Sequence, residues 1–143
     1  MKEIRTEIEI SAPAQKVWDI LIDFNRYQEW NPFIQRVSGK AVVGDQIKIW
    51  LRTPGGRERS YEPSIVKIDP GQELRWLGKS FFLDGEHVFV VEAMSPEKTR
   101  FIQFEIFKGF LARFFGESTE KDIAAGFEQM NQAIKRRAES VTI

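Results

Sequence analysis

The sequence contains no cysteine and only one histidine, His87, among its 143 residues. Without cysteine the chain cannot form disulfides, thiolate nucleophiles, iron–sulfur clusters or cysteine-ligated zinc sites. A single histidine also excludes any metal site built on two or more histidines, and it leaves one imidazole as a possible base. We therefore expect no bound metal and no other cofactor.

The sequence also lacks an excess of either charge and any long apolar run. Its 21 Lys and Arg residues balance 21 Asp and Glu residues, so the net charge is zero and we predict no nucleic-acid partner. No uncharged apolar run approaches the roughly 18 residues of a membrane helix, and the first residues do not resemble a signal peptide. We expect a cytoplasmic protein without a membrane span, folded as a single domain over residues 1–143.

Aromatic residues are abundant by contrast. The chain has 12 Phe, 4 Trp and 2 Tyr, spread from one end to the other, within an ordinary hydrophobic share of 42%. Large rings of this number need a large core or an apolar pocket to bury them.

The first thirty residues predict a strand followed by a helix. Residues 3–10 alternate charged side chains with Ile and Thr, which indicates a strand with one wet face and one buried face. Ser11 is a candidate capping residue and Pro13 suits a first helical turn, so a short helix is expected over about 13–23. Another helical turn or two can follow before Pro32.

The middle of the chain predicts an antiparallel meander, because short apolar runs alternate there with Gly-, Pro- and Asp-containing turns. With the first strand the sheet has seven strands. The six predicted here are at roughly 34–42, 46–53, 57–68, 73–81, 85–94 and 99–108.

The last segment predicts a helix of about 118–140 that covers this sheet. Its apolar stripe consists of Ile123, Phe127, Met130 and Ile134, which recur at helical spacing. Thr119 and Asp122 resemble a capping box at its start.

Several stretches of the chain, taken with this order of elements, resemble a known superfamily. They are residues 11–18, 27–33, 66–76 and 85–89, with 99–105 after them. They resemble the SRPBCC or START-like superfamily, also called the birch-pollen-allergen fold, and within it the small bacterial polyketide cyclase/dehydratase-like proteins. The resemblance implies an α+β helix-grip fold, in which a seven-stranded curved antiparallel sheet wraps around a long C-terminal helix with an apolar cavity between them.

His87 and Glu105 are the candidate catalytic pair. A turn centred near Pro96 and Glu97 would place His87 opposite Glu105, or one diagonal step away, on neighbouring strands. An imidazole oriented by a carboxylate in an apolar cavity could act as a general base, because the carboxylate favours the protonated ring while desolvation opposes it. The alternatives are a satisfied buried polar pair and a rim pair that binds the polar head of a ligand.

The candidate ligand-binding residues are large rings or lie on the predicted inner face of the sheet and the terminal helix. Such rings can line a cavity and stack on a ring-shaped ligand, and a core position is the alternative for each of them. The candidates are Trp30, Tyr61, Trp76, His87, Phe89, Phe101, Gln103, Phe110, Phe114, Phe127 and Met130.

The segment 109–116 places bulky apolar side chains between Gly109 and Gly116. Two glycines would permit unusual backbone dihedrals, so this segment could act as a gate over the cavity mouth. The alternatives are a plug at one end of the core and, if the side chains are exposed, a dimer patch.

Three functions follow from the sequence and the resemblance. We expect a non-enzymatic carrier or sensor that binds a small hydrophobic molecule, such as a lipid, polyketide-like aromatic or isoprenoid, in the internal cavity. The first alternative is a cyclase/dehydratase-type enzyme that uses His87 and Glu105. The second is a partner-binding module resembling chaperone-ATPase activators. A monomer or a weak homodimer is expected in each case.

Overall fold

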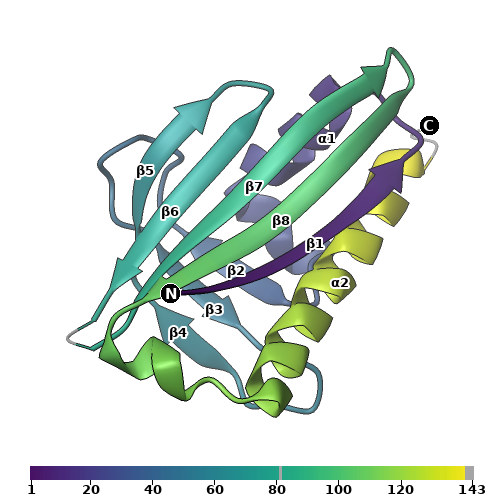
Figure 1. Cartoon of the computed structure of the whole chain (residues 1–143). Coiled ribbons are helices and arrows are strands. Elements are labelled where there is room, and N and C mark those ends of the chain that lie inside the picture. The colour runs from purple at the N-terminus through teal and green to yellow at the C-terminus, as the bar shows by residue number, and fades with distance from the viewer. Residues whose placement is uncertain (81, 141–143) are drawn as a thin grey trace.

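A computed structural model describes residues 1–80 and 82–140 as an α+β fold, in which antiparallel strands wrap one side of a long helix (Figure 1). The elements, with η for 3₁₀-helices, are β1 (Lys2–Ile10), α1 (Ala14–Ile22), η1 (Phe24–Glu29), β2 (Ile34–Ser38), β3 (Lys48–Leu51), β4 (Arg59–Tyr61), β5 (Ser64–Asp69), β6 (Glu73–Lys79), β7 (Asp84–Ser95), β8 (Lys98–Lys108), η2 (Phe110–Phe114) and α2 (Glu117–Glu139).

The strands form two hydrogen-bonded groups, β1-β8-β7-β6-β5 and β2-β3-β4. A single bridge between Gln46 and Ser64 links the groups. The strand predicted over 57–68 is two strands, β4 and β5, because Pro63 between them has no N–H to continue a ladder. The described strands therefore number eight where the sequence predicted seven, within the expected helix-grip arrangement.

The first strand joins the chain's beginning to its last hairpin. β1 pairs antiparallel with β8 along its whole length, from Lys2 opposite Phe107 to Ile10 opposite Thr99. The predicted alternation is confirmed, since the charged residues of β1 face solvent and the intervening side chains face the core. This long-range pairing makes β8 a central strand.

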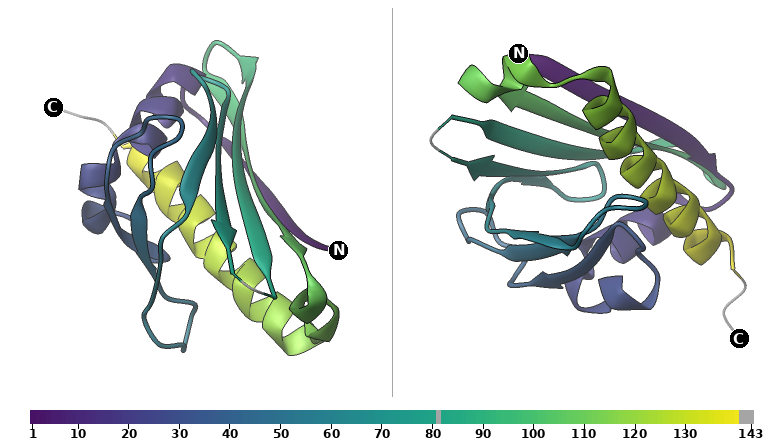
Figure 2. Two further views of the ribbon diagram at one scale, coloured as in Figure 1. Left: turned by 90° about the vertical axis from the view of Figure 1, so that its left-hand side faces the viewer. Right: turned by 90° about the horizontal axis from the view of Figure 1, so that it is seen from below.

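Helix α2 crosses the inner side of the sheet, as the two turned views show (Figure 2). Its predicted stripe is confirmed, because Phe127, Met130 and Ile134 are buried and Ile123 is partly buried against the core. The helix agrees with the predicted range to within one residue at each end.

The predicted helix caps are wrong. α1 begins after Pro13 and α2 begins after Gly116, and neither start has a side-chain cap hydrogen bond. Ser11 donates its backbone N–H to the Glu139 carboxylate instead, at 2.8 Å. Thr119 lies inside the first turn of α2, because the helix starts further upstream than the capping box required.

Three strands are shorter than predicted. β2 ends at Ser38 because Gly39 adopts a φ of 130°, which takes the chain out of the strand. β3 covers the central part of the predicted 46–53. β6 ends at Lys79, and residue 81 of the predicted 73–81 lies outside the described residues.

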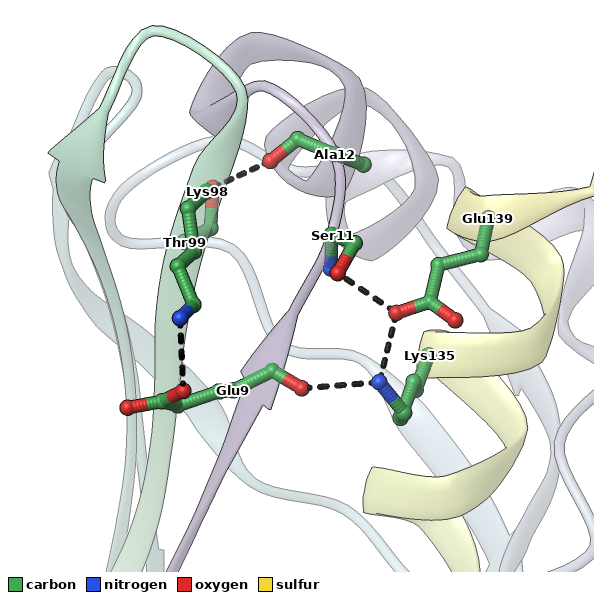
Figure 3. Close-up of polar contacts among 7 residues, drawn as sticks. All are labelled: Glu9, Ser11, Ala12, Lys98, Thr99, Lys135 and Glu139. Atoms are coloured by element: carbon green, nitrogen blue, oxygen red, sulfur yellow. Dashed lines mark hydrogen bonds and ion pairs between the residues drawn. The ribbon is translucent and has the colours of Figure 1, made fainter.

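A group of polar contacts fixes the C-terminal end of α2 to the sheet (Figure 3). The Lys135 ammonium donates to the Glu9 backbone carbonyl at 3.1 Å and to the Glu139 carboxylate at 2.6 Å. Beside it, the buried Thr99 hydroxyl donates to the Ala12 carbonyl at 2.7 Å. These contacts join β1, β8, α2 and the residues before α1 at one end of the sheet.

Candidate functional site

The hairpin β7–β8 places His87 directly opposite Glu105, as the sequence predicted, and β6 places Trp76 on the other side of His87. The sequence left open which face of this hairpin points inward, and contact of the His87 ring with Phe127 of α2 shows that it is the His87 face. Its buried members are His87, Phe89, Val91, Thr99, Phe101, Gln103 and Phe107.

His87 is held in a cage of rings. Its imidazole stacks on Phe89 with centroids 4.4 Å apart, and Phe127 and Trp76 lie 4.9 Å and 5.7 Å away. Nε2 lies 2.8 Å from the Gln103 side-chain oxygen. The ring is therefore fixed both by packing and by one hydrogen bond.

A chain of buried amides continues from His87 to β1. The Gln103 amide nitrogen donates to the Asn131 side-chain oxygen at 2.9 Å, and the Asn131 amide donates to the Thr6 hydroxyl at 2.8 Å. Because Gln103 donates through its nitrogen, its oxygen is the acceptor for His87. His87 therefore carries its proton on Nε2, and the lone pair of Nδ1 faces Glu105.

Sequence reasoning missed Asn131 and Thr6. A signal was present for each: Asn131 is four residues after Phe127 on the buried side of α2, and Thr6 is the polar member of the inward face of β1. Their pairing required the position of α2 relative to β1, which the sequence patterns do not contain.

Burial keeps both His87 and Glu105 uncharged near neutral pH. It lowers the pKa of His87 to about 4, against the smaller raising effect of the Gln103 hydrogen bond. It raises the pKa of Glu105 to about 8. Desolvation thus outweighs the expected stabilisation of a protonated ring, and the 3.6 Å contact between Nδ1 and Glu105 Oε1 joins two neutral groups.

Two glycines leave the inner face bare beside Glu105. Gly78 on β6 stands opposite Gly85 on β7, and the next pair on the same face is Trp76 and His87. A Cβ atom on Gly85 would lie 2.7 Å from Glu105 Oε2, so the carboxyl group occupies the place of that side chain. The Glu105 side chain is 20% exposed, which shows that solvent reaches this end of the face.

The two best-defined hollows of the described residues lie at the surface. The first, here called the β1–α2 hollow, has a volume of about 350 Å³ and lies between β1 and the first turns of α2. Four of its six lining residues are charged, and the other two are Ala124 and Ile4, which pairs with Glu105 across β1 and β8. The second, of about 510 Å³, surrounds the Pro70–Gly71 turn.

Neither hollow is the enclosed cavity that the resemblance implied. The reason is the packing of rings between the sheet and α2, where Phe89, Phe101 and Phe127 have no exposed surface.

The predicted ligand-binding residues fall into two groups. Trp76, His87, Phe89, Phe101, Gln103, Phe127 and Met130 are buried together on the inner face and α2. The other four lie elsewhere: Trp30 is partly buried against Tyr27, while Tyr61 on β4 and Phe110 and Phe114 on η2 are exposed.

The segment 109–116 has a buried side and an exposed side. Ala112 is buried and Phe115 packs on Phe107 with centroids 4.8 Å apart, so these two residues close one end of the core. Gly109 has the unusual φ of 107° that was expected, whereas Gly116, with a φ of −87°, does not.

Within residues 1–80 and 82–140, no group of three or more His, Cys, Asp or Glu side chains is arranged to hold a metal ion. The helices in these residues are too short or too polar to cross a bilayer.

Comparisons with known proteins agree with this architecture. Residues 1–139 match the family model described as polyketide cyclase / dehydrase and lipid transport. No curated protein matched the sequence.

Solved structures similar to this chain share its fold at low sequence identity. A START superfamily protein from Mycobacterium smegmatis is 17% identical with a TM-score of 0.78, covering 98% of this chain and 99% of its own. The Zhui aromatase/cyclase from Streptomyces sp. R1128 is 13% identical with a TM-score of 0.77, covering 96% and 93%. The protein Ara h 8.0201 is 14% identical with a TM-score of 0.73, covering 96% and 97%.

Proposed function

Because the chain belongs to the polyketide cyclase/dehydrase and lipid transport family, we propose that it binds a small hydrophobic molecule at the Glu105 end of the inner face. Glu105 is the polar contact for that molecule, and the surrounding rings supply the apolar contacts. The molecule is a lipid, a polyketide-like aromatic or an isoprenoid, and binding does not require turnover.

The observation that carries this proposal is an uncharged, partly exposed carboxyl group beside two glycines. An acid with a pKa of about 8 can donate one hydrogen bond and accept another at neutral pH. It can therefore bind a hydroxyl or carbonyl group without the large cost of burying a charge. Such a site favours an apolar molecule with one uncharged polar group over an organic cation.

The β1–α2 hollow supports access to this site. Its residue Ile4 stands opposite Glu105 in the β1–β8 ladder, so the hollow reaches the strand position next to the carboxyl group. Burial of about 300 Å² of ligand surface would contribute about 7 kcal/mol before the costs of association. Micromolar affinity is within that range.

The first test is native mass spectrometry of the purified protein, followed by solvent extraction of any bound molecule. We then measure binding of fatty acids, sterols and aromatic polyketides to the wild type and to Gly78→Val. A Cβ atom on Gly78 would have no neighbour closer than 3.9 Å, so the valine adds apolar volume on the face of β6 opposite Gly85, the glycine that adjoins Glu105. We expect about tenfold weaker binding for this variant.

Val66→Leu is the matched control, because Val66 is 40% exposed on the neighbouring strand β5. It adds volume away from the site and should leave affinity unchanged. A wild type that carries no apolar molecule and takes up none of the panel would contradict the proposal. Equal ligand affinity of Gly78→Val and the wild type would contradict the assignment of the binding site to the Glu105 end of the inner face.

An enzyme of the cyclase/dehydratase type is the second candidate, and the protonation of the Glu105–His87 pair favours it. The pKa of Glu105, about 8, suits a general acid that works near neutral pH. His87, with a pKa of about 4, stays neutral and lies 3.6 Å from the Glu105 carboxyl group, where it positions the acid. Glu105→Gln should then retain ligand binding and lose at least about 100-fold in turnover. Full turnover in that variant would exclude this role.

A further inference from the structure

The end of the molecule nearest Glu105 carries an exposed group of apolar and cationic side chains. We name it the cationic aromatic tip and define it as Lys79, Ser80, Phe82, Leu83 and residues 108–115. Phe114 is 66% exposed, Phe110 55% and Leu111 43%. Contiguous exposed side chains of this size on a small domain indicate an interaction surface.

Main-chain hydrogen bonds order the tip. The Leu111 N–H donates to the Phe82 carbonyl at 3.0 Å and joins its two parts, and the Ser80 N–H donates to the Leu83 carbonyl at 3.0 Å within the first part. In Figure 1 the η2 ribbon and the β6–β7 turn lie at the same end of the sheet. The exposed side chains therefore project from a fixed platform.

Cations outnumber carboxylates at the tip. Lys79, Lys108 and Arg113 are exposed and are its only charged residues, whereas the whole chain has no net charge. Arg113 lies over the Phe110 ring at 5.5 Å, so a cation and an aromatic ring are presented together. Asp84 borders the tip and stands opposite Lys79 in the β6–β7 ladder and opposite Lys108 in the β7–β8 ladder, so three cations and one carboxylate leave this surface with an excess of positive charge.

We propose that the cationic aromatic tip docks on the surface of an anionic lipid bilayer. Phenylalanine and leucine side chains can enter the boundary between headgroups and acyl chains while lysine and arginine remain beside anionic headgroups. A second copy of the chain is a poorer occupant, because a symmetric contact would oppose three cations with three cations. Docking goes beyond ligand binding and does not depend on it.

The experiment is co-sedimentation with phospholipid vesicles that contain no other ligand. We expect the wild type to bind vesicles with about 30% phosphatidylserine at least about tenfold more tightly than vesicles of phosphatidylcholine alone, and to be released by high salt. The double variant Phe110→Ser/Phe114→Ser should lose binding to both. Lys108→Glu/Arg113→Glu should lose the preference for phosphatidylserine.

The control is Val42→Ser/Val43→Ser, which removes two apolar side chains that are 49% and 55% exposed outside the tip. It should bind vesicles as the wild type does. Because Lys108 and Arg113 are exposed, their reversal tests the proposal without disturbing the core.

Three results would overturn the proposal. They are no vesicle binding by the wild type, equal vesicle binding by the wild type and both tip variants, and a loss of vesicle binding in the control variant as large as in the tip variants. A wild-type dimer that the Phe110→Ser/Phe114→Ser variant converts to a monomer, without vesicle binding, would assign the tip to protein association instead. Each result is independent of the ligand panel used for the proposed site.

Discussion

Gly126 of α2 lies directly beneath the ring of Phe33, so that a Cβ atom on Gly126 would lie 2.5 Å from Phe33 Cε1. Phe33 is buried and also contacts the Phe127 ring, with centroids 5.7 Å apart. The glycine thus sets how closely the segment before β2 approaches α2.

Gly126→Ala should destabilise the protein although alanine is the better helix former. Helix propensity favours alanine by about 1 kcal/mol, but displacing a packed ring costs about 1–3 kcal/mol. Urea unfolding of Gly126→Ala, Phe33→Leu and the double variant measures the coupling. In the Phe33→Leu background we expect the alanine to be neutral or stabilising, and stabilisation in the wild-type background would contradict this account.

The buried amide chain predicts a large effect at its centre. Gln103→Met keeps the shape but leaves the His87 Nε2–H and the Asn131 side-chain oxygen without their partner. We expect a loss of about 2–4 kcal/mol in the free energy of unfolding. The exposed Gln132→Met is the control, with a change within about 0.5 kcal/mol. Similar losses of stability in the Gln103 variant and the control would mean that the buried amide chain contributes nothing beyond packing.

The sequence predicted those parts of the fold that depend on local periodicity. The alternation of β1 and the stripe of α2 follow from repeated burial of one face, and the structure confirms both. Helix caps were not predictable from Ser11 or Thr119, because each start depends on where the preceding loop enters the helix.

The candidate pair was predictable and its surroundings were not. A short turn sets the register of β7 and β8, and register alone places His87 opposite Glu105. The contacts of Gln103 with Asn131, and the packed rings that leave the centre without an open hollow, depend on how α2 lies against the sheet. These contacts depend on the packing of residues that are far apart in the sequence.

The two uncharged groups predict an unusual pH dependence of stability. Between pH 4.5 and 6.5 the unfolded state has released the Glu105 proton that the folded state keeps, so this group lowers stability as pH rises. In the same interval the unfolded state keeps the His87 proton that the folded state has released, so this group raises stability as pH rises. The two effects oppose each other there. Between pH 6.5 and 8 His87 is neutral in both states, whereas Glu105 is protonated in the folded state and ionised in the unfolded state. The free energy of unfolding should therefore fall as pH rises.

We expect a decrease of about 1 kcal/mol over that interval, since the Glu105 side chain is 20% exposed and solvent moderates the effect. Urea unfolding at several pH values measures it. Glu105→Gln should abolish the fall above pH 6.5 and retain a rise from pH 4 to 6.5 caused by His87. A wild type whose stability rises from pH 6.5 to 8 would show that Glu105 is ionised in the folded protein.

Gly109 provides a test of how the cationic aromatic tip is fixed. Its φ of 107° disfavours any residue with a Cβ atom, and that atom would lie 2.5 Å from the Phe82 backbone oxygen. Gly44 has a similar φ of 96° and open space around the same position. Both substitutions to alanine carry a backbone cost of about 1 kcal/mol, and only Gly109→Ala carries a clash with main chain.

Gly109→Ala should therefore lose about 2–3 kcal/mol in the free energy of unfolding, against about 1 kcal/mol for Gly44→Ala. The clash pushes η2 away from the carbonyl that accepts the Leu111 N–H, so amide exchange at Leu111 should accelerate in Gly109→Ala and remain slow in Gly44→Ala. Equal stability losses together with unchanged exchange at Leu111 would mean that the tip adapts to the new atom. In that event the contact with Phe82 would not be what holds the exposed phenylalanines in place.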